Sequence, residues 1–413
     1  MRRGLRRLAS RVRGKISAEI YVVLGAYFFG DAAEATHMNP IKQFFAKLDL
    51  FKGGHEAGSV VGVDIGSSSI KVVELRKKGG RAELVTYGTL SLGPYGGADI
   101  GEITNLSVEQ ISKALTDVIR ESGVTTRSGA VAIPSAASLV FVLELPAVID
   151  EKQLGAIVPT EARKYIPVPI TEVSLDFWVI PKKEESIVEG DTTTLGQASV
   201  AKTEVLVAAI HNDTITKYKD IVGKTDLSVS FFEIETFSGV RSNFNRELGT
   251  VLLVDFGASK TKLTIIEYGI VRSFHIVTRG SVDITRALSQ SLSIPFARAE
   301  EIKREFGLFG SGTDKNVAEI CKLSADYIIS ETKSVMYSHE KKYNKTINKV
   351  ILSGGGSLLK GFFEAAKDAF SAEVTLGNPY SKVHVPGYIE GVLRETGPEF
   401  SVAVGLALRE LGA

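Results

Sequence analysis

The feature that most constrains the fold of this chain is a short pattern that occurs twice, about 190 residues apart. Val63–Lys71 reads VDIGSSSIK and Val254–Lys262 reads VDFGASKTK, so an aspartate, a glycine, a serine and a lysine recur in register. Apolar runs rich in β-branched residues flank both copies, and each copy therefore predicts a strand, a turn and a second strand. A repeat at this long spacing predicts two related lobes rather than a solenoid of short units.

The residues of the repeat are suited to binding phosphate and a metal ion. An aspartate at the end of a buried strand needs a nearby cation, and we assign Asp64 and Asp255 to a hydrated Mg²⁺. The glycine allows a tight turn whose N–H groups approach phosphate oxygens, while serine hydroxyls add donors and a lysine adds charge. The residues predicted to bind the phosphates are Gly66, Ser67, Ser68, Ser69, Lys71, Gly257, Ala258, Ser259 and Lys260. A plain Gly-Ser hairpin explains one copy equally well, but two copies in register favour the phosphate site.

A third glycine-containing turn lies near the C-terminal end. The apolar run Lys349–Leu352 leads into SGGGS at Ser353–Ser357, and a helix is expected from Leu358. Three glycines let the backbone pass close to a flat ligand, so a nucleotide base or ribose is expected at Gly354, Gly355, Gly356 and Ser357. The chain contains no G-x-x-x-x-G-K-[ST] motif, which excludes a P-loop as the phosphate site.

Composition excludes several other classes of protein. The 413 residues are 44% hydrophobic and carry a formal net charge of +1, so there is no global electrostatic argument for a nucleic-acid partner. One cysteine, Cys321, allows no internal disulfide and fits a reducing compartment. It lies in a segment with a helical pattern and is expected to be a buried, inert thiol. Strand patterns alternating with helix patterns, the latter at Ser107–Glu121, Lys152–Tyr165 and Asp213–Gly223, predict an α/β fold.

The first 38 residues differ from the rest of the chain. Seven basic residues precede an apolar run at Ile20–Phe29, a pattern that is also typical of a signal peptide or a basic membrane-surface segment. We favour a third interpretation, in which residues 1–37 are not native and Met38 is the start. Residues 39–58 form an amphipathic lead-in that is expected to pack on the body or to contact a membrane surface. The loop 182–194 is expected to be a solvated connection between strands.

Five segments, in order along the chain, resemble the motifs of the actin-like ATPase superfamily. Glu300 and Lys303, spaced E-x-x-K at the start of a helix, resemble the pair that approaches adenosine in chaperone-like members. A solvent-facing ion pair one helical turn apart is the alternative for these two residues. The five segments are Asp64–Lys71 and Asp255–Lys262 for the phosphates, Ser230–Ser238 and Ala403–Leu406 for the connections, and Leu352–Ser357 for adenosine.

Three segments relate the chain to one family of this superfamily: VVGVDIGSSSIKVVEL, EARKYIPVPITEVSLDF and ILSGGGSLLKGF. In these segments the chain most resembles the type IV pilus assembly PilM family, with the division protein FtsA as a near neighbour. The resemblance extends from about Ser59 to the end. FtsA members end in an amphipathic membrane tail, which the final residues, Leu408–Ala413, do not resemble. The resemblance implies an actin-like ATPase fold with two related, ribonuclease-H-like lobes and an FtsA-type inserted subdomain in the first lobe. The implied bounds are 59–124 and 225–247 for the first lobe, 125–224 for the inserted subdomain, and 248–413 for the second lobe.

The resemblance also implies a function. It suggests a cytoplasmic, ATP- and Mg²⁺-binding adaptor that is peripheral to the inner membrane and binds the N-terminal cytoplasmic peptide of a PilN-like protein. Other pilus platform or motor components and self-association are further expected contacts. Whether the chain turns ATP over is left open; Glu235, with Glu233 as second choice, is the residue expected to orient water. The alternatives are an FtsA-like filament protein and an actin-fold small-molecule kinase, which would need a catalytic aspartate that the segment Ala130–Ala136 lacks.

Overall fold

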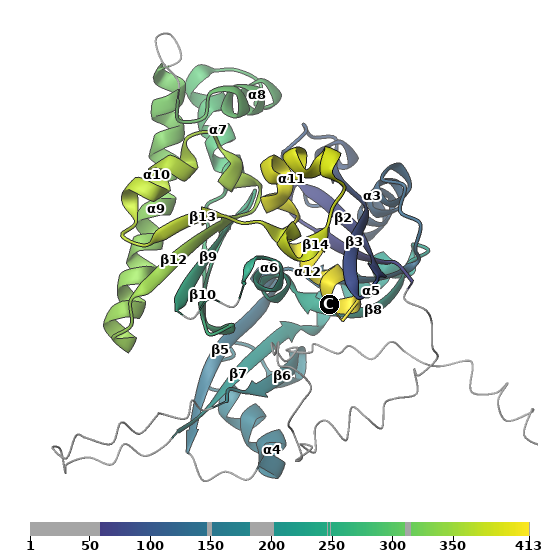
Figure 1. Cartoon of the computed structure of the whole chain (residues 1–413), viewed down its shortest axis with the longest axis vertical. Coiled ribbons are helices and arrows are strands. Elements are labelled where there is room, and N and C mark those ends of the chain that lie inside the picture. The colour runs from purple at the N-terminus through teal and green to yellow at the C-terminus, as the bar shows by residue number, and fades with distance from the viewer. Residues whose placement is uncertain are drawn as a thin grey trace, which may run out of the picture.

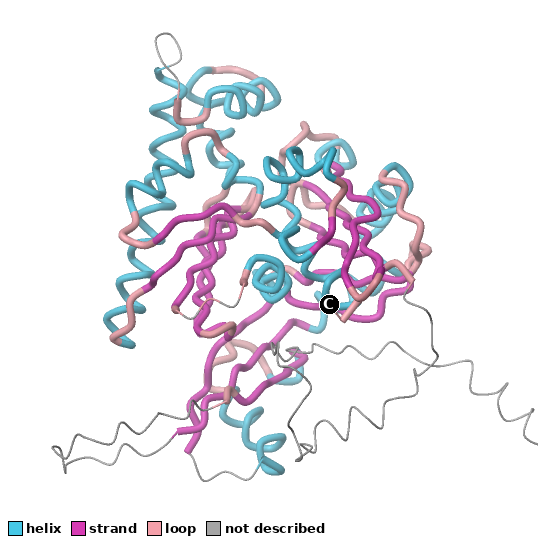
Figure 2. Tube along the Cα trace, in the orientation of Figure 1, coloured by secondary structure: helices cyan, strands magenta, loops and turns pink. Residues whose placement is uncertain are grey.

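The computed structural model describes residues 58–146, 151–181, 202–245, 247, 249–309 and 315–412. The extension 1–38, the lead-in 39–58 apart from its last residue, and the loop 182–194 lie outside these ranges. Three sheets, drawn as separate groups of magenta strands in Figure 2, organise the described residues. None of the helices in the described part of the chain is both long enough and apolar enough to cross a membrane.

The first sheet has six strands in the order β14-β3-β2-β1-β4-β8. The strand β1 pairs antiparallel with β2 and parallel with β4. The β1–β2 hairpin therefore lies beside the parallel strands β4 and β8. Every residue of β1 is buried, which matches its sequence VVGVDI, apolar apart from Asp64. The strands are β1 (Val60–Ile65), β2 (Ser69–Lys78), β3 (Arg81–Ser91), β4 (Ser128–Ile133), β8 (Ser228–Ile234) and β14 (Val383–His384).

The second sheet repeats this arrangement with five strands in the order β11-β10-β9-β12-β13. Here β9 pairs antiparallel with β10 and parallel with β12, as β1 does with β2 and β4. The two copies of the sequence repeat occupy equivalent hairpins, so the predicted pair of related lobes is confirmed. The strands are β9 (Thr250–Phe256), β10 (Thr261–Glu267), β11 (Ile270–Val277), β12 (Ile347–Ser353) and β13 (Glu373–Leu376).

Helices cover both larger sheets (Figure 1). The prediction for Ser107–Glu121 agrees with α3 (Val108–Glu121), whose first turn is capped by Ser107 and Gln110. Cys321 is buried in the long helix α9, as expected. The other helices are α4 (Glu151–Ala162), α5 (Asn212–Gly223), α6 (Glu235–Asn243), α7 (Ser281–Leu292), α8 (Phe296–Phe306), α9 (Lys315–Tyr343), α10 (Phe362–Ala369), α11 (Glu390–Thr396) and α12 (Ser401–Glu410).

Two helices, α6 and α12, lie between the two larger sheets (Figure 1). They approach with their backbones almost in contact, because a Cβ built on Gly405 would lie 1.9 Å from the carbonyl oxygen of Ser238. A Cβ on Gly62 would lie equally close to the carbonyl oxygen of Ala403, so α12 also packs directly on β1. These glycines let the connecting helices join the two lobes at close range.

The third sheet has three strands, in the order β5-β7-β6, and packs against α4. Its strands are β5 (Ser138–Pro146), β6 (Val173–Val179) and β7 (Lys202–His211). The predicted inserted subdomain, 125–224, includes more than this sheet. The strand β4 pairs with β1 and β8 of the first sheet, and Ser112 of α3 donates a hydrogen bond to the carbonyl oxygen of Ile221 in α5 at 3.0 Å.

We therefore propose narrower bounds for the inserted subdomain, Ser138–His211, and call this segment the insert. The C-terminal segment also departs from the predicted second lobe, 248–413. Its strand β14 pairs with β3, and α12 contacts β1, β2 and β4 of the first sheet. We propose that the second lobe spans 248–378 and that the remaining residues complete the first.

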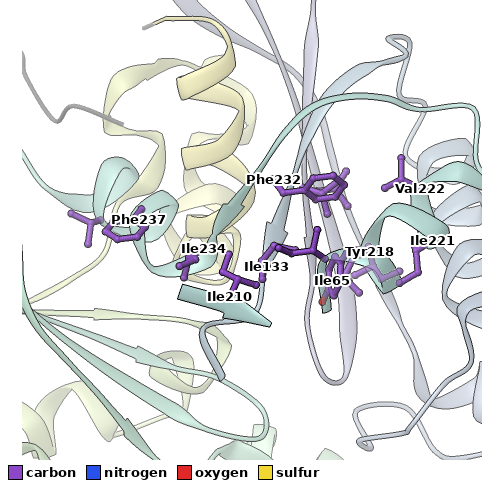
Figure 3. Close-up of a cluster of buried hydrophobic side chains, with 14 of the residues drawn as sticks. Ile65, Ile133, Ile210, Tyr218, Ile221, Val222, Phe232, Ile234 and Phe237 are labelled. Carbon is purple, nitrogen blue, oxygen red and sulfur yellow. The ribbon is translucent and has the colours of Figure 1, made fainter. Parts of the chain in front are cut away.

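The insert is joined to the first lobe by a shared apolar core. Figure 3 shows Ile210, at the end of β7, together with Ile133 of β4 and Ile234 of β8 in one cluster. Tyr218 and Ile221 of α5 extend this cluster toward Ile65, next to the first hairpin turn. The insert and the turn at the end of β1 are therefore linked through continuously packed side chains.

Candidate functional site

A cleft of about 880 Å³ lies where the two lobes face each other. It is lined by both hairpin turns, by the glycine run after β12, by the first residues of α6 and α7, and by Glu300, Lys303 and Arg304 of α8. All the residues predicted to bind nucleotide or metal, and Glu235 as the preferred candidate for orienting water, line this cleft, apart from Ser357. Those that do are Asp64, Gly66, Ser67, Ser68, Ser69, Lys71, Glu235, Asp255, Gly257, Ala258, Ser259, Lys260, Glu300, Lys303, Gly354, Gly355 and Gly356.

The two hairpin turns have the same backbone geometry. The Gly66 N–H donates to the carbonyl oxygen of Ser69 at 2.9 Å, and the Gly257 N–H donates to that of Lys260 at 3.1 Å. A Cβ on either glycine would lie within 3.0 Å of that same oxygen, so a larger residue would crowd the turn. Each turn leaves the following backbone N–H groups near the cleft, which is the arrangement that anion-binding turns use.

The two aspartates of the hairpins differ in their surroundings. Asp64 is buried and forms no ion pair with any described residue, and burial raises the pKa of its carboxyl to about 6. The Lys71 charge opposes this rise without cancelling it. Asp255, in contrast, lies 2.8 Å from the Lys262 Nζ. Asp64 is therefore the carboxylate that most needs a cation in this cleft.

Glu235, the preferred candidate for orienting water, lies at the first position of α6 and lines the cleft. Its Oε1 accepts a hydrogen bond from the Ser135 N–H at 2.8 Å, and its Oε2 lies 2.7 Å from the Lys262 Nζ. Glu233, the second choice, does not line the cleft. It is 1% exposed and ion-paired with Arg241 and Arg409. These contacts indicate that Glu233 stabilises the fold.

The glycine run after β12 passes close to the second hairpin. Gly354 has φ of 79°, and a Cβ on it would lie 2.4 Å from the Asp255 Oδ1. The Gly354 N–H donates to the carbonyl oxygen of Pro398 at 2.9 Å, which fixes the turn against the segment before α12. Ser357 is buried, and its hydroxyl donates back to the carbonyl oxygen of Gly354 at 2.7 Å. The Ser357 hydroxyl therefore forms a hydrogen bond within the turn and does not face the cleft.

Glu300 and Lys303 form a buried pair rather than a solvent-facing one. Both are less than 10% exposed, and their charged atoms lie 2.7 Å apart. Thr285 bonds to both, with its Oγ1 2.6 Å from the Glu300 Oε2 and 2.9 Å from the Lys303 Nζ. Burial opposes ionisation of Glu300, but the Lys303 charge together with the hydrogen bonds from Lys303, Thr285 and Arg304 outweighs burial and lowers the pKa of the carboxyl. The pair is held rigidly at the cleft wall.

The family model described as Type IV pilus assembly protein PilM matches residues 62–411. This chain belongs to the PilM family. The solved structure of a PilM–PilN type IV pilus biogenesis complex matches with a TM-score of 0.70 and 23% identity, over 85% of this chain and 98% of the solved chain. This likeness confirms the predicted actin-like, two-lobed fold.

The PilM-family chain is also similar to cell division proteins. It is 33% identical over 196 residues to FtsA of Helicobacter pylori strain J99, a match that covers 41% of this chain and 39% of that protein. It is 25% identical over 392 residues to FtsA of Pseudomonas aeruginosa, which covers 84% of this chain and 88% of that protein. The match to the first of these relatives thus spans only about two fifths of its length.

An actin-like fold implies a nucleotide and a divalent metal, and the residues of this PilM-family cleft fit both. The cationic side chains around the cleft outnumber the carboxylates, as a polyphosphate requires. Asp64, which forms no ion pair with any described residue, would hold Mg²⁺ through the metal's water shell. The cations are Lys71, Lys217, Lys260, Lys262, Lys303, Arg304 and Lys360, and the carboxylates are Asp64, Glu235, Asp255, Glu300 and Glu399.

Sequence reasoning missed five of these charged cleft residues. Lys262 had a signal, since it repeats Lys71 in the second copy of the pattern. The other four had none, because each belongs to a pattern that is typical of a solvent-exposed surface, and only the assembly of the two lobes brings it to the cleft. They are Lys217 on α5, Arg304 on α8, Lys360 after the glycine run and Glu399 before α12. Burial raises the pKa of the Glu399 carboxyl, and the Lys71 charge opposes this rise. The same two effects act on the carboxyl of Asp64.

Substitution of Gly354 is expected to weaken nucleotide binding. Gly354→Ala places a methyl group against the Asp255 carboxylate at a left-handed φ, and both effects push the turn into the cleft. We expect a loss of about tenfold in ATP affinity by titration calorimetry. Gly387→Ala is the matched control, because a Cβ there has no atom within 4 Å. Equal affinity in the two variants would remove Gly354 from the site.

Proposed function

We propose that this PilM-family chain is an ATP-binding adaptor of type IV pilus assembly, whose nucleotide state affects binding of a PilN-like membrane protein. The observation that carries the nucleotide part is the pair of equivalent glycine turns facing one cleft between the lobes. Family membership supports the pilus role, and the likeness to the solved PilM–PilN complex supports the choice of partner. Through that partner the chain would lie at the cytoplasmic side of the inner membrane.

Each group of the cleft has a role in this proposal. The N–H groups after Gly66 and Gly257 would bind phosphate oxygens, and Lys71 would orient them. A bound Mg²⁺ supplies positive charge beside the phosphates. The buried Glu300–Lys303 pair and the Gly354–Gly356 turn would bound the adenosine side.

The insert is where partner binding would be linked to the cleft. Its strand β7 leads directly into α5, which carries Lys217 to the cleft and Tyr218 into the core beside Ile65. A peptide that shifts the insert would therefore move groups that line the nucleotide site. By thermodynamic reciprocity, ATP would then change the affinity for the peptide by the same factor as the peptide changes that for ATP.

Calorimetry tests the two parts of this proposal separately. We expect micromolar or tighter binding of ATP with Mg²⁺, and binding of a peptide from the cytoplasmic N-terminus of a PilN-like protein, with a 5- to 100-fold change in peptide affinity when ATP is present. A scrambled peptide of the same composition is the control. ATP binding without peptide binding would reject the adaptor role and retain the nucleotide site.

The alternative supported by a specific observation is a filament protein, because the match to FtsA of Pseudomonas aeruginosa covers most of both chains. Sedimentation of the protein with ATP and Mg²⁺ distinguishes the two proposals. Polymer that pellets in the presence of ATP and is insensitive to the peptide would favour the filament role. A monomer that binds the peptide would favour the adaptor.

A further inference from the structure

We infer that Lys262 is a positioning residue that holds Glu235 between the second phosphate hairpin and the start of the insert. This inference rests on the proposed nucleotide site and names the residues that connect it to the insert. It depends on three observed contacts: Lys262 with Asp255, Lys262 with Glu235, and Glu235 with the backbone of Ser135.

The first two contacts join the lobes. Lys262 lies on β10 of the second lobe, and its Nζ is 2.8 Å from the Asp255 Oδ2 of the same hairpin. The same Nζ is 2.7 Å from the Oε2 of Glu235, which begins α6 in the first lobe. The side chains of all three residues are less than a quarter exposed, so the interaction is weakly screened by water. One ammonium group therefore holds two carboxylates from different lobes together.

The third contact extends this link to the insert. The other oxygen of Glu235, Oε1, accepts the N–H of Ser135 at 2.8 Å. Ser135 opens the short turn that leads into β5, the first strand of the insert, and its hydroxyl lies 2.7 Å from that of Thr236. Since both oxygens of Glu235 are engaged, its carboxylate cannot rotate without releasing either the hairpin or the start of the insert.

The first hairpin shows that this role is not a general property of the repeat. Lys71 holds the position equivalent to Lys262, but its Nζ contacts the Ser69 hydroxyl at 2.9 Å. In the described part of the chain it forms no ion pair with a carboxylate. Two lysines at the same place in two equivalent hairpins thus have different partners, and only Lys262 reaches a residue outside its own hairpin. Lys71 is consequently a matched control for the loss of a cleft cation.

An anionic ligand in the cleft would compete with Glu235 for the Lys262 ammonium. When the phosphates draw that ammonium away, Glu235 is released from the second hairpin and becomes free to turn. The N–H of Ser135 then loses its fixed acceptor. In this way the occupancy of the cleft affects the start of β5 without any contact between the ligand and the insert.

Hydrogen exchange of the Ser135 amide in the nucleotide-free, full-length protein tests this inference. We expect Lys262→Gln to accelerate exchange of that amide about tenfold, because a hydrogen bond to a positioned charged acceptor is weakened. Lys262→Arg, which keeps the charge, should restore at least half of the protection. Lys71→Gln should leave the rate within about twofold of the wild type.

Two results would overturn the inference. One is an unchanged Ser135 rate in Lys262→Gln while circular dichroism shows the variant to be folded. The other is an equal acceleration in Lys71→Gln, which would indicate general loosening of the cleft. Both readouts are made without ATP, so a wild-type protein that binds no nucleotide would reject the proposed function and not this assignment.

Discussion

Asp64→Asn is expected to stabilise the nucleotide-free protein and, at the same time, to weaken its binding of Mg-ATP. Burial raises the pKa of the Asp64 carboxyl from 3.8 to about 6, so folding at neutral pH requires an unfavourable buried charge. A difference of that size corresponds to a cost of about 2 to 3 kcal/mol, which the neutral amide of asparagine avoids in part. Loss of a carboxylate from the metal's water shell should lower affinity for Mg-ATP roughly 10- to 100-fold.

The stabilisation expected from Asp64→Asn should depend on pH and should increase as the pH rises. A raised pKa means that the folded state binds the proton more readily, so Asp64 costs nothing below its unfolded pKa of 3.8. The cost grows as the pH rises from 3.8 through about 6 and is constant above that. Urea unfolding of the two proteins between pH 4 and pH 8 should therefore show a gap that opens over this interval.

Asp255→Asn is the matched control for Asp64→Asn. Asp255 is paired with Lys262, so its removal takes away a favourable contact and should not stabilise the protein. If Asp64→Asn lowers the free energy of unfolding at pH 8 by as much as Asp255→Asn does, Asp64 is not an uncompensated charge. Unchanged affinity of Asp64→Asn for Mg-ATP would remove the residue from the metal site.

The lobes and hairpins could be predicted because their signals are local. A buried strand, a glycine turn and a polar strand end are consecutive in sequence, and the second copy removes the ambiguity of the first. The equivalent strand orders of the two sheets follow from that duplication. What the pattern at Val63–Lys71 cannot indicate is the partner of its lysine, because that depends on which lobe lies opposite.

The bounds of the insert could not be predicted for a related reason. The strand at Ser128–Ile133 has the same apolar character as the strands that follow it. Its place in the first sheet is decided by pairing with β1 and β8, which are distant in sequence. The exclusion of Ser357 from the cleft has the same origin, since its hydroxyl turns back to Gly354 only after the turn has formed.

The sequence itself favours Glu235 over Glu233, but only the structure shows how their surroundings differ. The two residues lie two positions apart at the junction of β8 and α6. Because the strand ends between them and the helix begins at Glu235, the two side chains point in different directions. Glu235 faces the cleft and Lys262, whereas Glu233 faces Arg241 of α6 and Arg409 of α12.

Glu233→Gln should therefore be one of the most destabilising single changes in the chain. Both oxygens of Glu233 accept from Arg241, at 2.7 Å each, and Arg409 and the Ser238 hydroxyl add further donors. Burial opposes ionisation, but Arg241 and Arg409 outweigh it and lower the pKa of this carboxyl. Without the negative charge, two arginines between α6 and α12 lose Glu233 as a buried counter-ion, at a cost of about 3 to 5 kcal/mol.

Glu235→Gln provides the comparison that separates a structural role from a functional one. Its amide oxygen can still accept the Ser135 N–H, and Lys262 keeps Asp255 as a partner, so the loss in stability should stay below about 1.5 kcal/mol. Urea unfolding at pH 7.5 measures both variants, and ATP titration of each at a temperature where it is folded measures the site. We expect Glu233→Gln to lose stability and keep its affinity for ATP, because its charge cluster lies outside the cleft. The reverse pattern, with Glu235→Gln the less stable variant, would mean that the cleft carboxylate holds the lobes together and that Glu233 must be reconsidered as the group that acts on the nucleotide.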